Sequence, residues 1–435
     1  MARDSPAASD LRYRLFFMKI ILLIIFSTTF ISAQSQADST RQLADSGKAE
    51  FLYQVKLDTP GFEKAERILR NQLKLDPANA ELHYYYGYVL DRINALDGKG
   101  MPSVKIGLAL KASEQFELVN KLEPTYKHDL YLLDPYSKIT AIWGSLAQSF
   151  FLKGQIDSAR WAFRQGKNRG GYIEPILEFN RQLLSTCKKN SILLTNGDNI
   201  TFPIWYLQEI EKFRPDITPV DVNLINTKWY PKYLIQSKGI KSGLTNLMID
   251  TLDYLEWKSQ NITIKDRNDS TKVLSWELKP TYMNAYILKG DIFLLDLLKQ
   301  NFYSRPFYFS NYSDSTYNLY LTDHLIDQGL VSSISVTRVD NMKDTLFINP
   351  NLASYSLPKT KINDIAKSQD AVTTLSMLRW AYYSNISHLI QLEKYDLARK
   401  LLEEMQRKFP WQKLPFSSPD EEKYFQGMKD MLKNR

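Results

Sequence analysis

The sequence has a single cysteine, Cys187, among its 435 residues. One cysteine excludes a disulfide framework and any cysteine-based zinc site, and a free cysteine is most often a buried core residue. Glycine-rich phosphate loops, the nucleophile elbow of hydrolases and the nicotinamide fingerprint are absent as well. The histidines stand alone without the spacing of metal ligands: His83, His128, His324 and His388. We therefore predict no metal ion and no cofactor.

Runs of lysine and arginine interleaved with aromatic residues are also missing, although the formal net charge is +8. Nucleic-acid-binding surfaces usually gather their basic residues in one patch, so we predict no nucleic-acid partner. Hydrophobic residues make up 44% of the chain, which is enough for a core and for two or three packing units.

Long apolar runs are limited to one segment near the N-terminus, from Ile20 to Ala33. It is too short for a comfortable membrane span and matches the apolar region of a signal peptide, with a small-residue cleavage site at Ser32-Ala33. We predict a signal peptide over residues 1–33, with Met18 as an alternative start. The mature protein is expected to be periplasmic or otherwise exported, without a stable membrane span. A signal anchor in the inner membrane is the alternative.

Residues 38–185 have the pattern of irregular tetratricopeptide-like helical repeats. Gly154 is expected at a turn between two of these helices. The recurring feature is an alanine followed twelve residues later by a proline, where the alanine permits close helix packing and the proline ends the helix. It occurs at Ala65 and Pro77, at Ala112 and Pro124, and again near the C-terminus at Ala398 and Pro410.

A strand, a polar turn and a helix follow in the next segment. Ile192 to Thr195 is apolar and β-branched, as in a buried strand, and residues 196–199 read Asn-Gly-Asp-Asn, which is typical of a turn. Asn199 or Thr201 can cap a helix that carries Pro203 in its first turn. A second strand is predicted from Ile217 to Val222.

Alternating strands and helices continue through residues 190–360 and predict a mostly parallel sheet. Further strands are expected at Arg305–Ser310 and Ser332–Val336, with a helix at Asp291–Gln300 and a polar hairpin or insertion at Asn261–Trp276. Residues 370–435 are expected to be helical again, with a last, weakly packed helix. The predicted fold is thus an α/β domain flanked by all-α segments: helical repeats before it and a helical hairpin after it.

Residues 195–230, which read TNGDNITFPIWYLQEIEKFRPDITPVDVNLINTKWY, resemble the soluble C-terminal domain of the bacterial protein O-mannosyltransferase-like membrane family, a domain of unknown function. The resemblance extends to 180–187, 305–310, 321–336 and 377–415. Family members carry many membrane spans that hold the sugar-transfer machinery. We find no such span after the N-terminal segment, so the resemblance implies a shared fold and a shared partner rather than catalysis.

The polar turn marks the candidate site, because ligands of open α/β sheets bind at the carboxyl ends of the strands. Asp198 is the first candidate for a functional carboxylate, and Trp229 with Tyr230 could form an aromatic platform beside it. Each has a structural alternative: turn capping for the polar residues, core packing for the aromatics and an ion pair for Arg305. The predicted ligand-binding residues are Asn196, Asp198, Asn199, Thr201, Trp229, Tyr230 and Arg305.

These observations predict an exported cell-envelope protein that binds a polypeptide or a glycan and has no catalytic residues. The expected partner is an envelope polypeptide or glycoprotein, and a membrane glycosyltransferase is a further candidate. The alternative is a glycan-acting enzyme or glycosyltransferase subunit that uses Asp198 as an acid, a base or a ligand for sugar hydroxyls.

Overall fold

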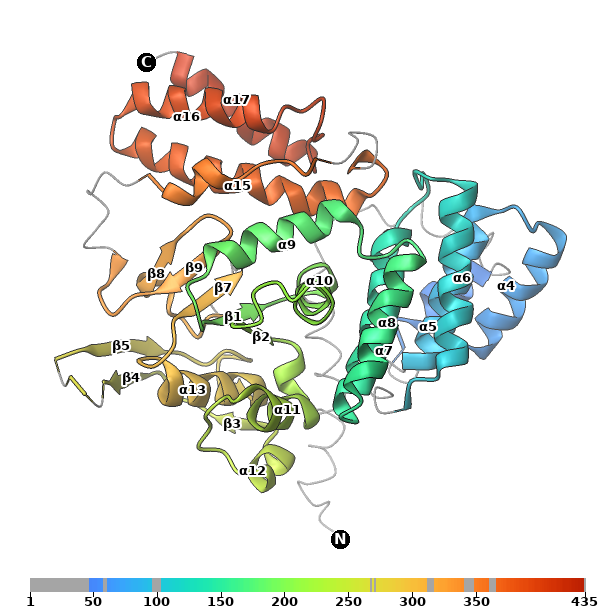
Figure 1. Cartoon of the computed structure of the whole chain (residues 1–435), viewed down its shortest axis with the longest axis horizontal. Helices are drawn as coiled ribbons and strands as arrows, with labels where there is room; N and C mark the ends of the chain where they lie inside the picture. Colours follow the sequence, from blue (N-terminus) through green and yellow to red (C-terminus); the bar gives the residue numbers. More distant parts are fainter. Residues whose placement is uncertain are drawn as a thin grey trace, which may run out of the picture. The chain divides into compact units, whose positions relative to one another are not determined.

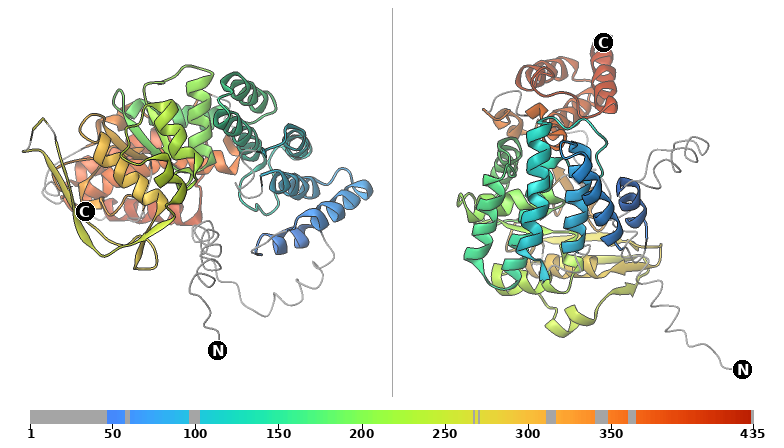
Figure 2. Two further views of the ribbon diagram at one scale, coloured as in Figure 1. Left: turned by 90° about the horizontal axis from the view of Figure 1, so that it is seen from below. Right: turned by 90° about the vertical axis from the view of Figure 1, so that its right-hand side faces the viewer.

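The computed structural model describes residues 47–57, 61–95, 103–266, 268–269, 271–310, 317–339, 348–359 and 365–433 (Figures 1 and 2). The predicted signal peptide and its cleavage site lie outside these residues. The chain forms two compact units, which meet in sequence at Pro124 and Thr125. None of the helices in the described ranges combines the length and the hydropathy that a bilayer crossing needs.

The first unit is helical, with four described helices: α3 (Gly47–Gln54), α4 (Glu63–Leu75), α5 (Ala80–Ala95) and α6 (Ile106–Leu122). Ala65 and Ala112 are fully buried, and α4 and α6 each end two residues before the predicted proline. Edge-to-face contacts among Tyr84, Tyr88 and Phe116, with ring centroids 5.0 to 5.8 Å apart, hold α5 against α6. The predicted helices are confirmed, whereas their assignment to tetratricopeptide repeats stays a prediction.

The second unit opens with three helices, α7 (Pro135–Leu152), α8 (Ile156–Asn168) and α9 (Glu174–Thr186). Gly154 forms the turn between α7 and α8 at a φ of 70°, a left-handed angle that glycine adopts without strain. All three pack against α10 (Asp198–Glu209), the first helix of the α/β segment. This contact explains why they belong to the same compact unit as the sheet, although the sequence placed a domain boundary between 185 and 190.

A five-stranded mixed sheet forms the centre of the second unit, in the order β2-β1-β7-β9-β8. The parallel half consists of β2 (Thr218–Asp221), β1 (Ile192–Thr195) and β7 (Phe307–Ser310). The antiparallel half is completed by β9 (Val331–Ile334) and β8 (Leu325–Asp327). Every residue of β1, β2 and β7 is buried, as expected for strands covered on both faces.

Helices cover both faces of this sheet (Figure 1). On one face lies α10, with α9 and then α15 (Gln369–Gln391) packed beyond it. On the other face lie α13 (Lys289–Asn301) and α11 (Trp229–Lys238). The predicted α/β domain with flanking helices is therefore the fold of this unit.

Several short elements lie between β2 and β7. They are a 3-10 turn at Leu224–Asn226, α12 (Asn246–Thr251) and the two-stranded sheet of β3 (Tyr254–Glu256) and β6 (Tyr286–Leu288). The predicted polar hairpin is formed by β4 (Gln260–Lys265) and β5 (Val273–Leu278). Its residues alternate between buried and exposed, because one face packs on the protein and the other faces solvent.

The C-terminal helices are α15, α16 (Tyr395–Lys408) and α17 (Pro419–Lys433), preceded by a 3-10 turn at Pro350–Ser354. Ala398 is fully buried in α16, which ends two residues before Pro410 as predicted. The last helix is more firmly held than predicted. Arg379 of α15 and Glu421 of α17 form a fully buried ion pair with an Nε–Oε1 distance of 2.6 Å.

The start of α10 differs from the prediction. The helix begins at Asp198 after Gly197, which has a φ of 84°, so neither Asn199 nor Thr201 is the cap and Pro203 lies inside the helix. Proline has no N–H and therefore leaves the carbonyl four residues earlier, that of Asn199, without its helical donor. The buried Asn180 side chain of α9 supplies the donor, with an Nδ2–O distance of 2.9 Å. The sequence could not show this compensation, because Asn180 belongs to another helix.

Candidate functional site

The predicted site lies where the parallel strands end. Thr195, the last residue of β1, pairs in register with Asp221, the last residue of β2. Ser310 ends β7 at the same edge, and its hydroxyl donates to the Leu194 carbonyl at 3.0 Å. Because β1, β2 and β7 run parallel, their carboxyl ends meet at one edge, as the prediction of a site required.

A closed hydrogen-bond cluster occupies this edge. The Thr201 hydroxyl donates to Asp221 Oδ2 at 2.6 Å and accepts from the Thr195 hydroxyl at 2.9 Å. The other oxygen, Asp221 Oδ1, accepts the backbone N–H groups of Asn223 at 2.9 Å and Leu224 at 3.0 Å. Burial raises the pKa of the Asp221 carboxyl, and these hydrogen bonds oppose that shift. Of the three side chains in this cluster, only Thr201 is among the residues predicted for the site.

The three polar residues of the turn, Asn196, Asp198 and Asn199, follow β1 at this edge, and all are half-buried. The Asn196 side chain accepts a hydrogen bond from Asn223 Nδ2 at 2.7 Å, which joins the ends of β1 and β2. Asp198 is the first residue of α10. The backbone carbonyl of Asn199 accepts a hydrogen bond from Asn180 Nδ2, and the side chain of Asn199 hydrogen-bonds to Asp370.

The predicted aromatic pair, Trp229 and Tyr230, forms the start of α11. Only Trp229 is partly exposed. Tyr230 is fully buried, where its hydroxyl accepts the Asp221 N–H at 3.1 Å and donates to the Pro219 carbonyl at 3.3 Å. Trp229 is half-buried and meets the Tyr230 ring edge-on, with a centroid distance of 5.3 Å. Tyr230 therefore ties α11 to β2, and Trp229 is the residue of the pair that a ligand could reach.

Arg305 lies at the opposite edge of the sheet. Its guanidinium donates to the carbonyl of Asn190 at 2.9 Å, to that of Ser191 at 3.1 Å and to the Thr218 hydroxyl at 2.7 Å. These groups stand at the beginnings of β1 and β2, and burial lowers the pKa of Arg305. Arg305 therefore does not lie with the other predicted ligand-binding residues. Its hydrogen-bond partners are two carbonyls and a hydroxyl, whereas the alternative prediction was an ion pair with a carboxylate.

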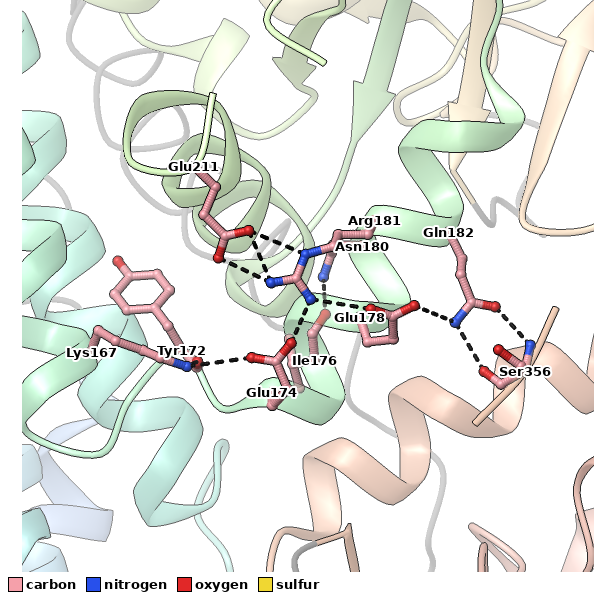
Figure 3. Close-up of polar contacts among 10 residues, drawn as sticks. All are labelled: Lys167, Tyr172, Glu174, Ile176, Glu178, Asn180, Arg181, Gln182, Glu211 and Ser356. Carbon is pink, nitrogen blue, oxygen red and sulfur yellow. Dashed lines mark hydrogen bonds and ion pairs between the residues drawn. The ribbon is translucent and has the colours of Figure 1, made fainter. Parts of the chain in front are cut away.

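The outer face of α9 carries an ion-pair network centred on Arg181 (Figure 3). The guanidinium contacts carboxylates of Glu174 at 2.5 Å, Glu178 at 3.1 Å and Glu211 at 2.9 Å. Partial burial opposes the charge of Arg181, but the hydrogen bonds that Arg181 donates to Glu174 and Glu211 outweigh this effect and raise its pKa. Helix α9 thus contacts the first turn of α10 through buried Asn180 and the segment after the end of α10 through Arg181 and Glu211.

A pair of neighbouring buried carboxyl groups, Asp134 and Asp370, was not predicted from the sequence. Asp134 caps the start of α7, and Asp370 lies in the first turn of α15. Each carboxylate accepts the backbone N–H of the other residue: Asp370 N–H donates to Asp134 Oδ2 at 3.0 Å, and Asp134 N–H donates to Asp370 Oδ2 at 2.8 Å. Ser368 also donates to Asp134 through its hydroxyl. Burial raises the pKa of both carboxyls, to about 7 for Asp370, where the charge of Asp134 adds to the effect.

The second unit also contains a cleft of about 300 Å³ that the sequence did not indicate. Polar side chains within residues 275–279 and 320–324 line it, together with Arg338; we call it the polar cleft. Figure 1 shows β5 running next to the β8 end of the sheet, where these segments meet. Only the alternation of Ser275, Trp276 and Glu277 along β5 is visible in the sequence, and it does not reveal which segment faces it.

Within the described ranges, no group of three or more His, Cys, Asp or Glu side chains is arranged to hold a metal ion. Cys187 is buried, as predicted, and burial raises the pKa of its thiol to about 12, so it is not a reactive thiolate. At the carboxyl edge, the polar groups of Thr195, Thr201 and Asp221 hydrogen-bond to one another. This arrangement supports the ends of the strands structurally.

Residues 176–279 and 246–350 match a family model. The family is TMEM260-associated domain 2. The matched segment runs from α9 to beyond β9 and contains the sheet, the carboxyl edge and the polar cleft. It covers less than half of the chain and agrees with the resemblance to O-mannosyltransferase-like proteins. No curated protein and no solved structure gives a significant match.

Proposed function

We propose that this chain is an exported binding protein of the cell envelope, which holds a polypeptide or a glycan without transforming it. The observation that carries the proposal is the hydrogen bonding of Asp221. Both of its carboxylate oxygens accept hydrogen bonds from the chain itself, so this acid supports the strand ends. An acid–base catalyst would instead need hydrogen-bond reach to a substrate proton.

The match to TMEM260-associated domain 2 supports a relation to O-mannosyltransferase-like proteins. A protein that shares this domain could bind the polypeptide that such a transferase glycosylates, or the glycan on that polypeptide. A membrane glycosyltransferase is therefore the proposed partner. Export is supported by the apolar segment from Ile20 to Ala33 in the sequence.

A glycan-acting enzyme that uses Asp198 is the second candidate. One observation favours it: Asp198 is half-buried at the first position of α10, on the carboxyl side of the sheet where ligands of such folds bind. The two candidates differ in what Asp198 does. If its carboxylate only supports the start of α10, replacing it with an amide leaves the captured molecule and its chemistry unchanged.

The test uses the full chain with a C-terminal tag, expressed in a bacterial host, together with its Asp198→Asn and Asp221→Asn variants. We expect the mature chain to begin near Gln34, and all three proteins to capture the same envelope polypeptide or glycopeptide. A chain that keeps Ile20 in the membrane fraction would contradict export. Conversion of the captured molecule by the parent protein, lost in Asp198→Asn at unchanged stability, would establish the enzyme instead.

A further inference from the structure

The polar cleft carries an inference beyond binding in general, because its side chains restrict the chemistry of the ligand. His324 is the most informative of them. It is 3% exposed and lines the cleft, and its Nδ1 lies 2.9 Å from the Ser335 carbonyl. A carbonyl oxygen only accepts, so Nδ1 carries the proton and Nε2 of the neutral ring is an acceptor. As a residue of the cleft lining, His324 thus offers an acceptor to a hydroxyl or N–H of a ligand.

The charges that line the cleft are balanced. Lys279 lies 3.7 Å from Glu277, and Arg338 forms an ion pair with Asp323. All four side chains are more than half exposed and each cation already faces a carboxylate, so the cleft gives no net electrostatic advantage to an anion or to a cation. The same four side chains still present hydrogen-bond donors and acceptors at short range.

Two aromatic side chains complete the lining. The Trp276 indole N–H donates to the Leu319 carbonyl at 2.7 Å, and the Tyr320 hydroxyl donates to the Pro280 carbonyl at 3.0 Å. Because the Trp276 N–H is already used, the ring contributes apolar surface only. A small apolar surface beside many polar groups suits a ligand that has both kinds of surface.

We propose that the polar cleft binds an uncharged, hydroxyl-rich molecule of the size of one or two sugar rings. Hydroxyl groups both donate and accept hydrogen bonds. They can donate to His324 and to the carboxylates of Glu277 and Asp323. They can accept from Lys279 and Arg338. The volume of about 300 Å³ is at the lower end of known ligand pockets, which favours a small ligand. This inference rests on the proposed function and names the ligand class of one site within it.

The experiment measures binding of four probes to the full-length protein: the neutral methyl glycosides of glucose and galactose, the anionic glucuronate and the cationic glucosamine. Titration calorimetry or saturation-transfer NMR gives the dissociation constants. We expect at least one neutral glycoside to bind about tenfold more tightly than either charged sugar, since neither charge finds an unpaired partner. Tighter binding of a charged sugar, or binding of none by the folded protein, would overturn the proposal.

Two variants test the location and the charge argument. Asp323→Asn removes the partner of Arg338, so the preference for glucuronate over the neutral glycoside should rise by about tenfold. His324→Gln replaces the rigid ring acceptor by a flexible amide and should weaken binding of the neutral glycoside by about five- to tenfold. Glu256→Gln, an exposed change on β3 outside the cleft lining, is the control and should change neither constant.

Thermal unfolding of each variant shows whether the fold is intact, and Asp323→Asn keeps the proposal testable if His324→Gln fails to fold, because Asp323 is exposed. A folded Asp323→Asn protein with the parent's sugar preference would place binding elsewhere and overturn the proposal. The proposed function is judged separately, by capture of an envelope molecule. Capture that is unaffected in a protein that binds no sugar would leave the proposed function standing while this inference fails.

Discussion

The Thr201 hydroxyl donates to the Asp221 carboxylate at 2.6 Å and so joins helix α10 to the end of strand β2. The two residues are fully or nearly fully buried, at 2% and 5% exposure. At the edge of the sheet where the sequence predicts a ligand, two polar side chains thus hydrogen-bond to each other.

Replacing Asp221 with alanine should lower the free energy of unfolding by about 3 kcal/mol, because the Thr201 hydroxyl and two backbone N–H groups lose a buried acceptor. Urea unfolding gives the value. Asp221→Asn is the matched control, since its amide oxygen can still accept from the backbone and should cost less. Equal losses in the two variants would show that the charge, rather than the hydrogen bonds, holds the strand end.

The amide of Asn180 should be needed only because Pro203 interrupts α10. Asn180→Ala is expected to cost about 1–3 kcal/mol, since the half-buried carbonyl of Asn199 loses its donor. Adding Pro203→Ala restores a helical N–H for that carbonyl and should recover part of the loss. A double-mutant cycle measures the coupling, expected to exceed about 0.5 kcal/mol. Strictly additive effects would contradict this explanation of the proline in the helix.

Asp370 should make the protein less stable as the pH rises. Its pKa is raised from 3.8 to about 7 in the folded protein, so the folded state holds this proton more tightly than the unfolded chain. The resulting stabilisation is complete below about pH 4 and is lost as the pH rises to about 7. Asp370→Asn imitates the protonated acid, so it should melt like the parent near pH 4 and a few degrees higher at pH 8. A variant that melts lower at pH 8 would show that the charged form is the stable one.

Arg181 holds three carboxylates together, so its loss should be felt most at low salt. Arg181→Met is expected to cost about 1 kcal/mol at low ionic strength and less at about 1 M NaCl, because salt screens the repulsion left among Glu174, Glu178 and Glu211. Lys272→Met, which breaks the exposed pair with Asp269, is the control and should have little effect. The same loss at both salt concentrations would indicate packing rather than charge.

The sequence was most informative where structure depends on neighbours in the chain. The bounds of β1 and the helix ends before Pro77, Pro124 and Pro410 follow from apolar runs and from proline chemistry, and these predictions are confirmed. It was least informative about α10, where buried Asn180 on another helix permits an internal proline.

For the site, the sequence located the carboxyl edge but grouped its residues incorrectly. Arg305 precedes β7, whereas Asn196 follows β1, and in a parallel pair these positions lie at opposite edges. The pairing of β1 with β7, more than a hundred residues away in the chain, had to be known before that rule could be applied. The polar cleft depends on a similar long-range contact, between β5 and residues 320–324.

The most direct test of binding without catalysis is the mass of the bound molecule. The envelope polypeptide or glycopeptide that the full-length protein captures would be incubated with fresh protein and analysed by mass spectrometry before and after. We predict that the molecule is recovered with unchanged mass, both from the parent protein and from Asp198→Asn. A gain or loss of sugar mass with the parent protein, abolished by Asp198→Asn at unchanged melting temperature, would contradict it.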